Sequence, residues 1–425
     1  MLAALLSLLL AQAAAAVGAP RPASEATYAR LKPSLFTIEV HSGNDGSRSS
    51  LGSGYLVSRD GLVVTNYHVV GAYVDEPLRY SLRAKGAAGE RPARLVRIDV
   101  VNDLALLRLE GVSADPLRIA PADPSPGAAI VAFGNPEGLG LSLIEGIFNG
   151  YAEKGLVDRM LLSMPLNSGM SGGPILDGRG EVIGTNVSVM WQSNSLSFGV
   201  PASKLHELLA GPPLELEPKA LRAELQRQLA LLETQTTERL LAAFAAVPQD
   251  AGVRVGGASA RRPPEAFDCW DDKHEYKDEG VVKARFGCNL QFTPALNELG
   301  EVASVELLIE HFASSRSRFG LFGFLAGHGQ GHSSVEALDP ENGVRSAPHC
   351  TAERVRFAGR AWKTTACATA YVKHPGYGDY ELSATSLDSA DGASFVQLSV
   401  QGFKAASFLA LSRSFLASLS PEPSR

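Results

Sequence analysis

Ser171 stands among glycines in the stretch Asn-Ser-Gly-Met-Ser-Gly-Gly-Pro-Ile-Leu, which runs from Asn167 to Leu176. Hydrolysis through a serine needs backbone N–H groups about 2.7–3.1 Å from the position where the oxyanion develops. Glycines allow the unusual dihedral angles and the close approach that this arrangement requires. We therefore predict that Ser171 is a nucleophile and that the N–H groups of Gly169 and Ser171 form an oxyanion hole. A plain glycine-rich turn between two strands is the structural alternative.

Two further residues could complete this chemistry. A serine hydroxyl is a weak nucleophile until a base takes its proton, and a carboxylate must orient that base. His68 comes at the end of an apolar run that we predict to be a strand, and Asp103 starts another apolar run, Leu-Ala-Leu-Leu. Each residue alone has an ordinary structural explanation. Together, in the chain order His68, Asp103, Ser171, they predict a catalytic triad.

The elements around these residues are short β-branched runs separated by turn signals, from Ala26 to about Leu209. Asp60-Gly61 and Asn135-Pro136 are two of the signals, and both pairs are typical of turns between strands. This spacing predicts an all-β region, built either as two barrels or as one sandwich.

Four blocks in this region resemble the chymotrypsin-like serine proteases, and among them the HtrA-type branch of exported quality-control proteases. The blocks are Gly52 to Val70, Asp99 to Leu109, Asn167 to Asn186 and Leu196 to Leu205. The resemblance covers about residues 26–210. It implies a mainly β protein whose residues 21–210 form a double six-stranded β-barrel. It also implies that His68 is the general base and acid, that Asp103 orients it, and that Ser171 forms an acyl-enzyme without any metal or organic cofactor.

The resemblance has two departures. Met170 stands where this family usually has asparagine, and nothing after residue 211 resembles the family's peptide-binding PDZ domain. The catalytic groups are unaffected by the first departure. The second means that the family's PDZ-dependent regulation and assembly are not carried over to this chain.

Substrate contacts follow from the same resemblance. It implies that the strand Val187, Ser188 and Val189 pairs with the substrate backbone by β-augmentation. Pro165 occupies the place where trypsin-type enzymes have the acid that binds Lys or Arg. The neighbouring walls are Met164, Val189 and Met190. We expect an apolar pocket that accepts small or medium aliphatic residues before the scissile bond.

The pattern changes after Gly211-Pro212-Pro213, and residues 211–250 are predicted to be a helical connector. Apolar residues recur at helical spacing between Pro218 and Pro248, at Leu221, Leu225, Leu229, Leu232, Leu240 and Phe244. The opposite face mixes Glu, Gln and Arg, which favours packing on a neighbouring domain over a membrane. Residues 251–265 are predicted to be a linker.

Residues 266–425 are predicted to form a small α+β domain with disulfide bonds and an unassigned fold. Alternation from Val282 to Phe292 indicates a half-buried strand, and Phe408 to Leu419 indicates a final helix. The cysteines of the chain are Cys269, Cys288, Cys350 and Cys367, which allow three pairings. We favour Cys269 with Cys288 and Cys350 with Cys367, because each closes a short loop worth about 3 kcal/mol.

The first twenty residues contain no charged side chain and end in small residues, as a signal peptide does. We predict that residues 1–20 are a signal peptide, or an N-terminal anchor if they are not cleaved. The protein would then be periplasmic or secreted. The formal net charge is −6 and no long basic run occurs, which argues against a nucleic-acid partner.

Two minor motifs carry less weight. His328 and His332 are four residues apart, but the surrounding glycines predict a loop instead of a zinc-binding helix. Asn186 begins an Asn-Val-Ser glycosylation sequence, yet it falls inside a predicted strand and is discounted. The sequence therefore predicts no metal site.

The sequence as a whole favours an exported serine endopeptidase that acts on polypeptides, among them unfolded or damaged proteins. One alternative is a catalytically latent protease fold that binds its partners. Another is an esterase, because Gly-Met-Ser-Gly-Gly also fits the nucleophile elbow of α/β-hydrolases. That elbow needs a helix directly after the serine, whereas Gly-Gly-Pro follows Ser171. The C-terminal domain is expected to recruit substrates or to regulate the site.

Overall fold

The structure is a computed structural model. It describes residues 24–187, 196–211, 217–246, 253–255, 258–260, 267–278, 280–296, 300–314, 343–357, 360–386 and 392–421. The chain divides into two units. Unit 1 consists of Met1–Ile98, Leu104–Tyr151 and Arg159–Leu216, and unit 2 consists of Asp99–Asp103, Ala152–Asp158 and Glu217–Arg425. Two turns that are inserted between strands of unit 1 thus belong to unit 2.

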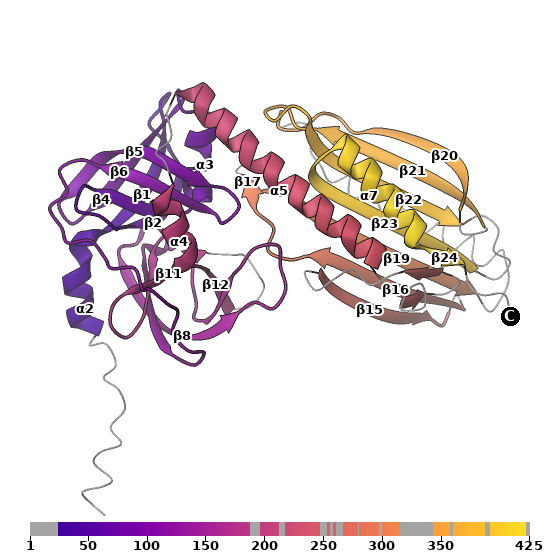
Figure 1. Cartoon of the computed structure of the whole chain (residues 1–425), viewed down its shortest axis with the longest axis horizontal. Helices are drawn as coiled ribbons and strands as arrows, with labels where there is room; N and C mark the ends of the chain where they lie inside the picture. The colour runs from indigo at the N-terminus through magenta and orange to yellow at the C-terminus, as the bar shows by residue number, and fades with distance from the viewer. Residues whose placement is uncertain are drawn as a thin grey trace, which may run out of the picture. The chain divides into compact units, whose positions relative to one another are not determined.

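Unit 1 contains two closed six-stranded barrels, which confirms the predicted double barrel (Figure 1). The first has the strand order β1-β2-β3-β6-β5-β4 and the second the order β10-β11-β12-β9-β8-β7. The first comprises β1 Leu35–Ser42, β2 Arg48–Leu56, β3 Leu62–Thr65, β4 Tyr80–Gly86, β5 Gly89–Asp99 and β6 Leu104–Leu109. The second comprises β7 Ala129–Gly134, β8 Ser142–Tyr151, β9 Met160–Ser163, β10 Pro174–Leu176, β11 Val182–Val187 and β12 Leu196–Pro201.

Alternating burial and tight turns explain the barrels. In β1, Ile38 and Val40 are fully buried, whereas the side chains between them are half-buried. The predicted turn at Asp60-Gly61 joins β2 to β3, and Gly61 has a φ of 88°. A Cβ at Gly61 would lie 2.0 Å from the carbonyl oxygen of Leu109, so only glycine fits there.

Helices cover the barrels at three places: α2 Ser24–Leu31, α3 Tyr67–Asp75 and α4 Ala202–Ala210. Two 3-10 turns, η2 Lys32–Ser34 and η3 Pro136–Gly138, complete the elements of unit 1. The expectation that His68 ends a strand is wrong, because β3 stops at Thr65 and His68 is the second residue of α3. Val69, Val70 and Val74 are buried along this helix. Their packing overrides the strand preference of β-branched residues.

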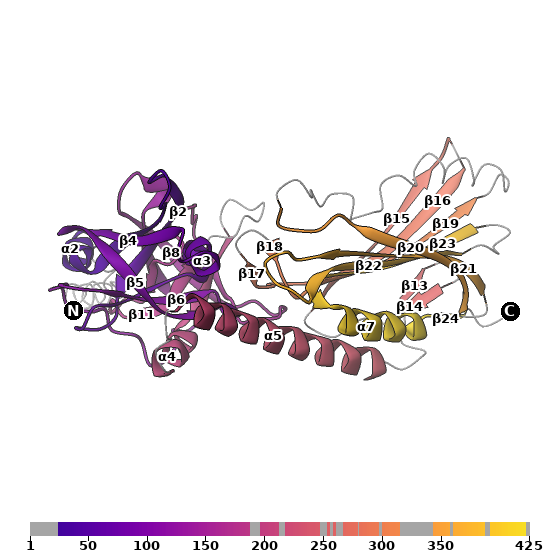
Figure 2. The same cartoon turned by 90° about the horizontal axis from the view of Figure 1, so that it is seen from above.

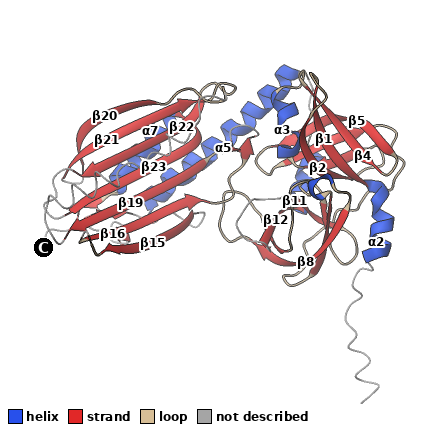
Figure 3. Ribbon diagram, turned by 180° about the vertical axis from the view of Figure 1, so that it is seen from behind, coloured by secondary structure: helices blue, strands red, loops and turns tan. Residues whose placement is uncertain are grey.

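Unit 2 is built around a seven-stranded sheet with the order β15-β16-β19-β23-β22-β21-β20 (Figure 3). Its strands are β15 Phe267–Tyr276, β16 Val281–Leu290, β19 Ser304–Ser314, β20 His349–Phe357, β21 Arg360–Ala370, β22 Tyr377–Ser386 and β23 Gly392–Lys404. A two-stranded pair, β17 Ala295–Leu296 and β18 Gly300–Glu301, accompanies it. The sheet and the helices of unit 2 form the expected α+β arrangement.

Two helices, α5 Pro218–Ala246 and α7 Ala405–Ser418, lie on one face of this sheet (Figure 2). The ring of Phe408 in α7 stacks on Tyr380 of β22 with centroids 5.1 Å apart. The ring of Phe244 in α5 lies 6.3 Å from Phe415 of α7. All six apolar positions predicted for the first helix are buried. Among the described residues, no helix is long and apolar enough to cross a membrane.

The segment expected to be a linker contains two strands, β13 Val253–Val255 and β14 Ala258–Ala260. They form a three-stranded sheet with β24 Ser420–Pro421. The predicted linker at 251–265 thus contains two paired strands. The second partner of β14 lies near the end of the chain, where a local pattern cannot reveal it.

Both favoured disulfide pairings are confirmed. Cys269 is bonded to Cys288, and Cys350 is bonded to Cys367. Each bond joins residues directly opposite one another, the first on β15 and β16 and the second on β20 and β21. Because β15 and β20 are the two edges of the sheet, each edge strand is cross-linked to its neighbour.

Candidate active site

The turn that carries Ser171 lies between β9 and β10 and is held in one shape by hydrogen bonds. The N–H of Gly172 donates to the carbonyl of Asn186 at 3.0 Å, and the N–H of Asn186 donates to Gly173 at 2.8 Å. The N–H of Ser53 donates to the Ser171 carbonyl at 2.7 Å. The Ser171 residue itself is only 3% exposed. The nucleophile candidate is thus fixed by strands β2 and β11.

Glycine at position 172 is required by the neighbours of the turn. Gly172 has a φ of 85°, and a Cβ there would lie 2.2 Å from the carbonyl oxygen of Ser53 and 2.9 Å from the amide nitrogen of Asn66. Asn66 directly precedes α3. The backbone after Ser171 is therefore packed against the start of the helix that carries His68.

A second close approach links the same segments. A Cβ on Gly52 of β2 would lie 2.4 Å from the Cγ2 atom of Val69 and 3.1 Å from the carbonyl oxygen of Ser171. Val69 is the neighbour of His68 in α3. Gly52 is thus in contact with both the helix of the predicted base and the turn of the predicted nucleophile.

Asp103 lies immediately before β6. Antiparallel pairing sets Thr65, the last residue of β3, opposite Ala105 of β6. The chain that leaves β3 toward His68 and the chain that enters β6 from Asp103 therefore lie at the same end of this strand pair. Asp103 has a φ of 62°, in the left-handed region that aspartate adopts more often than most residues other than glycine. The register brings together the backbone segments of the predicted base and acid.

The predicted oxyanion hole is built on an equally constrained glycine. Gly169 has a φ of 89°, and a Cβ there would lie 2.3 Å from the carbonyl oxygen of Asn135. Its own carbonyl accepts a hydrogen bond from the Ser53 hydroxyl at 2.7 Å. Within the part of the chain that the structure describes, no backbone carbonyl accepts from the Gly169 N–H. That donor is one of the two predicted to bind an oxyanion.

Comparison with known proteins agrees with this geometry. Residues 52–184 match a family model described as a trypsin-like peptidase domain. These residues form a trypsin-like peptidase domain. A "probable periplasmic serine endoprotease DegP-like" of Ectopseudomonas mendocina is 33% identical over 167 residues, which are 37% of this chain and 34% of the relative. The predicted likeness to chymotrypsin-like proteases of the HtrA type is thereby confirmed.

Other relatives show the same pattern of coverage. "Serine protease HTRA1A" of Danio rerio is 33% identical over 199 residues, which are 43% of this chain and 39% of the relative. The chain thus spans about a third of the length of the first relatives that it matches. The crystal structure of the active form of Rv3671c protease from M. tuberculosis is similar, with a TM-score of 0.42 and 21% identity. It covers 47% of this chain and 90% of that one.

Met170, which stands where the HtrA-type proteases usually have asparagine, is fully buried. A Cβ on Gly134 of β7 would lie 2.6 Å from the Met170 Cα atom, so β7 packs directly beneath the turn. The apolar side chain of Met170 is therefore buried against β7.

Sequence reasoning missed the structural role of Asn186 in the peptidase domain. This residue is fully buried in β11, and its Nδ2 group donates to the carbonyl oxygens of Phe133 at 2.9 Å and Met170 at 3.3 Å. Burial explains why its glycosylation sequence is irrelevant. Ser53 was also missed, and its only signal was its position between two glycines in β2.

The core beside Asn186 joins the two barrels of the peptidase domain. The hydroxyl groups of Tyr55 in β2 and Thr185 in β11 are 2.9 Å apart. Burial raises the pKa of Tyr55 well above its ordinary value, because the charged form would lose its hydration. Tyr55 is therefore a neutral hydrogen-bonding group.

The structure places part of the predicted substrate contacts. Val187 ends β11, and Ser188, Val189 and Met190 lie outside the described residues. Met164 is buried, and its carbonyl accepts a hydrogen bond from Ser197 of β12 at 2.6 Å. Met164 is therefore a packed apolar residue, and its contact with a substrate stays a prediction.

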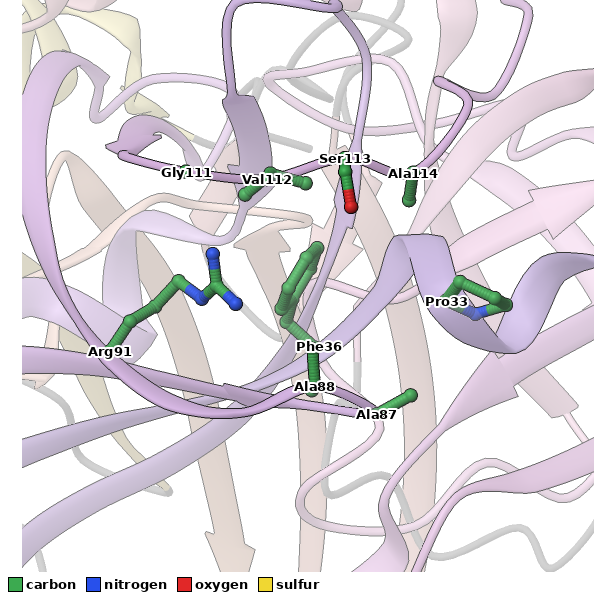
Figure 4. A pocket seen from close by; sticks show the side chains of 10 residues that line it. Pro33, Phe36, Ala87, Ala88, Arg91, Gly111, Val112, Ser113 and Ala114 are labelled. Atoms are coloured by element: carbon green, nitrogen blue, oxygen red, sulfur yellow. The ribbon is translucent and has the colours of Figure 1, made fainter.

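A pocket of about 130 Å³ in the first barrel is separate from these groups (Figure 4). Phe36, Arg91 and Val112 are among its lining residues, and none of the predicted site residues is. We assign it no part in the peptidase chemistry. No group of three or more His, Cys, Asp or Glu side chains that could hold a metal occurs within the described ranges. His328 and His332 lie outside them.

Proposed function

We propose that this protein is an exported serine endopeptidase that hydrolyses peptide bonds through an acyl-enzyme on Ser171. The observation that carries the proposal is the packing of the Ser171 turn against the start of α3. Gly172 cannot carry a Cβ there without meeting Asn66. The pairing of β3 with β6 adds the segment of Asp103 at the same end.

The mechanism assigns one task to each group. His68 takes the proton from the Ser171 hydroxyl as the Oγ atom attacks the scissile carbonyl. The N–H groups of Gly169 and Ser171 stabilise the negative charge that develops on the carbonyl oxygen. His68 then gives the proton to the leaving amine as the C–N bond breaks. Water then attacks the acyl-enzyme ester on Ser171, with His68 again acting first as base and then as acid, and Ser171 regains its proton. Asp103 keeps the imidazole in the correct tautomer throughout.

The substrate is proposed to be an extended polypeptide that adds a strand beside Val187, Ser188 and Val189. The chain has Pro165 where trypsin-type enzymes have an acid, and Met164 beside it is buried and apolar. Cleavage is therefore expected after small or medium aliphatic residues. A digest cut mainly after Lys and Arg would contradict this preference.

Export rests on two observations. The chain contains two disulfide bonds, which persist in oxidising compartments. The first relative is named a periplasmic endoprotease. We propose that unfolded or damaged proteins of such a compartment are substrates, because only an extended chain can add a strand beside Val187, Ser188 and Val189.

The decisive experiment is digestion of reduced casein by the wild type, by Ser171→Ala and by Ser168→Ala, with the products identified by mass spectrometry. Ser168 is exposed in the same turn, so its variant controls for a local change. We expect the first variant to lose cleavage and the second to retain it. Fluorophosphonate labelling should mark Ser171 in the wild type.

The outcomes separate this proposal from its alternatives. Absence of both cleavage and labelling in the wild type would indicate a latent fold that binds partners. Hydrolysis of simple esters without hydrolysis of casein would indicate an esterase. Labelling that survives Ser171→Ala would show that another residue is the nucleophile.

A further inference from the structure

The turn Asp99–Asp103 joins β5 to β6 of the first barrel but belongs to unit 2. The Asp99 carboxylate accepts hydrogen bonds from the Asn102 backbone at 3.0 Å and from the Asn102 side chain at 2.7 Å. Val100 is 1% exposed. Its N–H group is consequently hidden from water and needs a partner inside the protein.

The partner of this N–H group comes from α5. The Oε1 atom of Gln228 accepts the hydrogen bond from Val100 at 2.8 Å, and Gln228 is itself 9% exposed. Its Nε2 group donates to Glu224, one helical turn earlier, at 2.7 Å. Both the oxygen and the nitrogen of the Gln228 carboxamide are therefore hydrogen-bonded, which fixes the orientation of the group.

Glu224 is held in turn by Arg227, whose guanidinium donates to both carboxylate oxygens at 2.8 and 2.7 Å. This pair lowers the pKa of Glu224, so Glu224 stays an acceptor for Gln228. The chain of contacts runs from Arg227 through Glu224 and Gln228 to Val100.

Asp103 follows Val100 by three positions, at the end of the same turn. Its φ of 62° lies in the left-handed region, which aspartate tolerates better than most residues but which is less favourable than the right-handed region. Small changes at Val100 would therefore be transmitted along the short turn to Asp103.

We propose that Gln228 is a positioning residue that holds Asp103 in the orientation required by the triad. The inference rests on the proposed function and adds a form of regulation to it. Hydrolysis becomes dependent on the state of α5, which lies far from Ser171 in the sequence and touches neither substrate nor nucleophile in the proposed mechanism. Displacement of α5 would slow the enzyme by releasing the turn.

The test compares Gln228→Leu with Gln226→Leu in the full-length protein. Leucine at 228 keeps the size of the side chain but removes the acceptor, and position 226 offers the same change elsewhere on α5. We expect Gln228→Leu to lower kcat by about tenfold or more with an unchanged KM, because misorientation of the acid weakens the base. The Val100 amide should exchange with solvent faster in this variant alone.

A rescue variant separates positioning from folding. In Glu224→Gln combined with Gln228→Glu, the carboxylate at 228 can accept from Val100 and from the new amide at 224. We expect most of the lost kcat to return. The pH profile of kcat/KM should show a lower apparent pKa for the base in Gln228→Leu and a restored value in the rescue.

The possible failures are distinguishable. A wild type that neither cleaves casein nor labels at Ser171 removes the proposed function, and this inference with it. An active wild type with equally active Gln228→Leu overturns only the inference. Equal losses in Gln226→Leu and Gln228→Leu, or no recovery in the rescue, also overturn it, because the effect would then be a general one on α5.

Discussion

Gly172 illustrates how a single residue can be constrained by both dihedral angle and space. Its φ of 85° disfavours any side chain, and its neighbours leave no room for a Cβ. Gly46 has a similar φ of 70° but no atom within 4 Å of the position where a Cβ would be. Replacement of Gly46 by alanine therefore tests the cost of the dihedral angle alone, and replacement of Gly172 tests that cost together with the cost of the steric contact.

We predict that Gly172→Ala lowers kcat/KM by about 10²-fold or more, because displacement of a catalytic group by about 1 Å has that effect. Gly46→Ala should cost about 1 kcal/mol of stability and leave the rate unchanged. Casein cleavage and urea unfolding of both variants provide the test. Equal activity in the two variants would show that the contact with Asn66 does not position Ser171.

Asn186 is a second single residue on which the site depends, because its buried side chain donates hydrogen bonds to two backbone carbonyls. Removal of its carboxamide in Asn186→Ala leaves the oxygens of Phe133 and Met170 without this partner, which should cost about 1–3 kcal/mol. The rate of fluorophosphonate labelling should fall as well, because Met170 precedes the nucleophile. Asn149→Ala is the control, since Asn149 is exposed and bonds only a side chain, that of Ser163. A normal labelling rate in Asn186→Ala would refute the role.

At the scale of elements, the hairpin between β21 and β22 carries a histidine that couples folding to pH. His374 is 5% exposed. Burial, followed by the charges of Arg222 and Lys373, lowers the pKa of His374 below its ordinary value of 6.5. The unfolded chain therefore binds the proton more readily than the folded one. Stability from this group is complete above pH 6.5 and declines as the pH falls through the lower folded value.

We predict that the free energy of unfolding of the wild type falls between pH 7.5 and pH 5.0, and that it falls less in His374→Gln. Glutamine keeps a neutral polar side chain of comparable size but cannot take the proton. Urea unfolding followed by tryptophan fluorescence, to which the buried Trp362 of unit 2 contributes, measures the difference. Identical pH dependence in the two proteins would exclude His374 as the source.

The whole molecule shows which features a sequence reveals. Turn signals and β-branched runs predicted an all-β region, the resemblance to chymotrypsin-like proteases implied the two barrels, and short loop lengths selected the disulfide partners Cys269–Cys288 and Cys350–Cys367. The helix at His68 was missed because Val69 and Val70 extend a run of β-branched residues. The pairing of β14 with β24 and the roles of Gln228 and Asn186 depend on partners far along the chain. Local periodicity contains no information about such partners.

Division of the chain into two units leads to a prediction about truncation. A protein that ends at Leu216 retains every strand of both barrels but lacks α5. We expect it to cleave casein at least about tenfold more slowly than the full-length protein, since the turn of Asp103 loses its partner. Circular dichroism should show that its β structure is retained. Unchanged kinetics on every substrate would mean that residues 217–425 do not influence the site.

The cross-links at both edges of the seven-stranded sheet have a mechanical consequence. A strand at a sheet edge yields to tension by peeling, because its hydrogen bonds can break one after another. In this sheet each outer strand is anchored near one end, at the third residue of β15 by Cys269–Cys288 and at the second residue of β20 by Cys350–Cys367. A peel that starts at that end stops early at the covalent bond, and a peel that starts at the other end cannot detach the strand. The sheet is thus reinforced against force at the two places where a sheet is weakest.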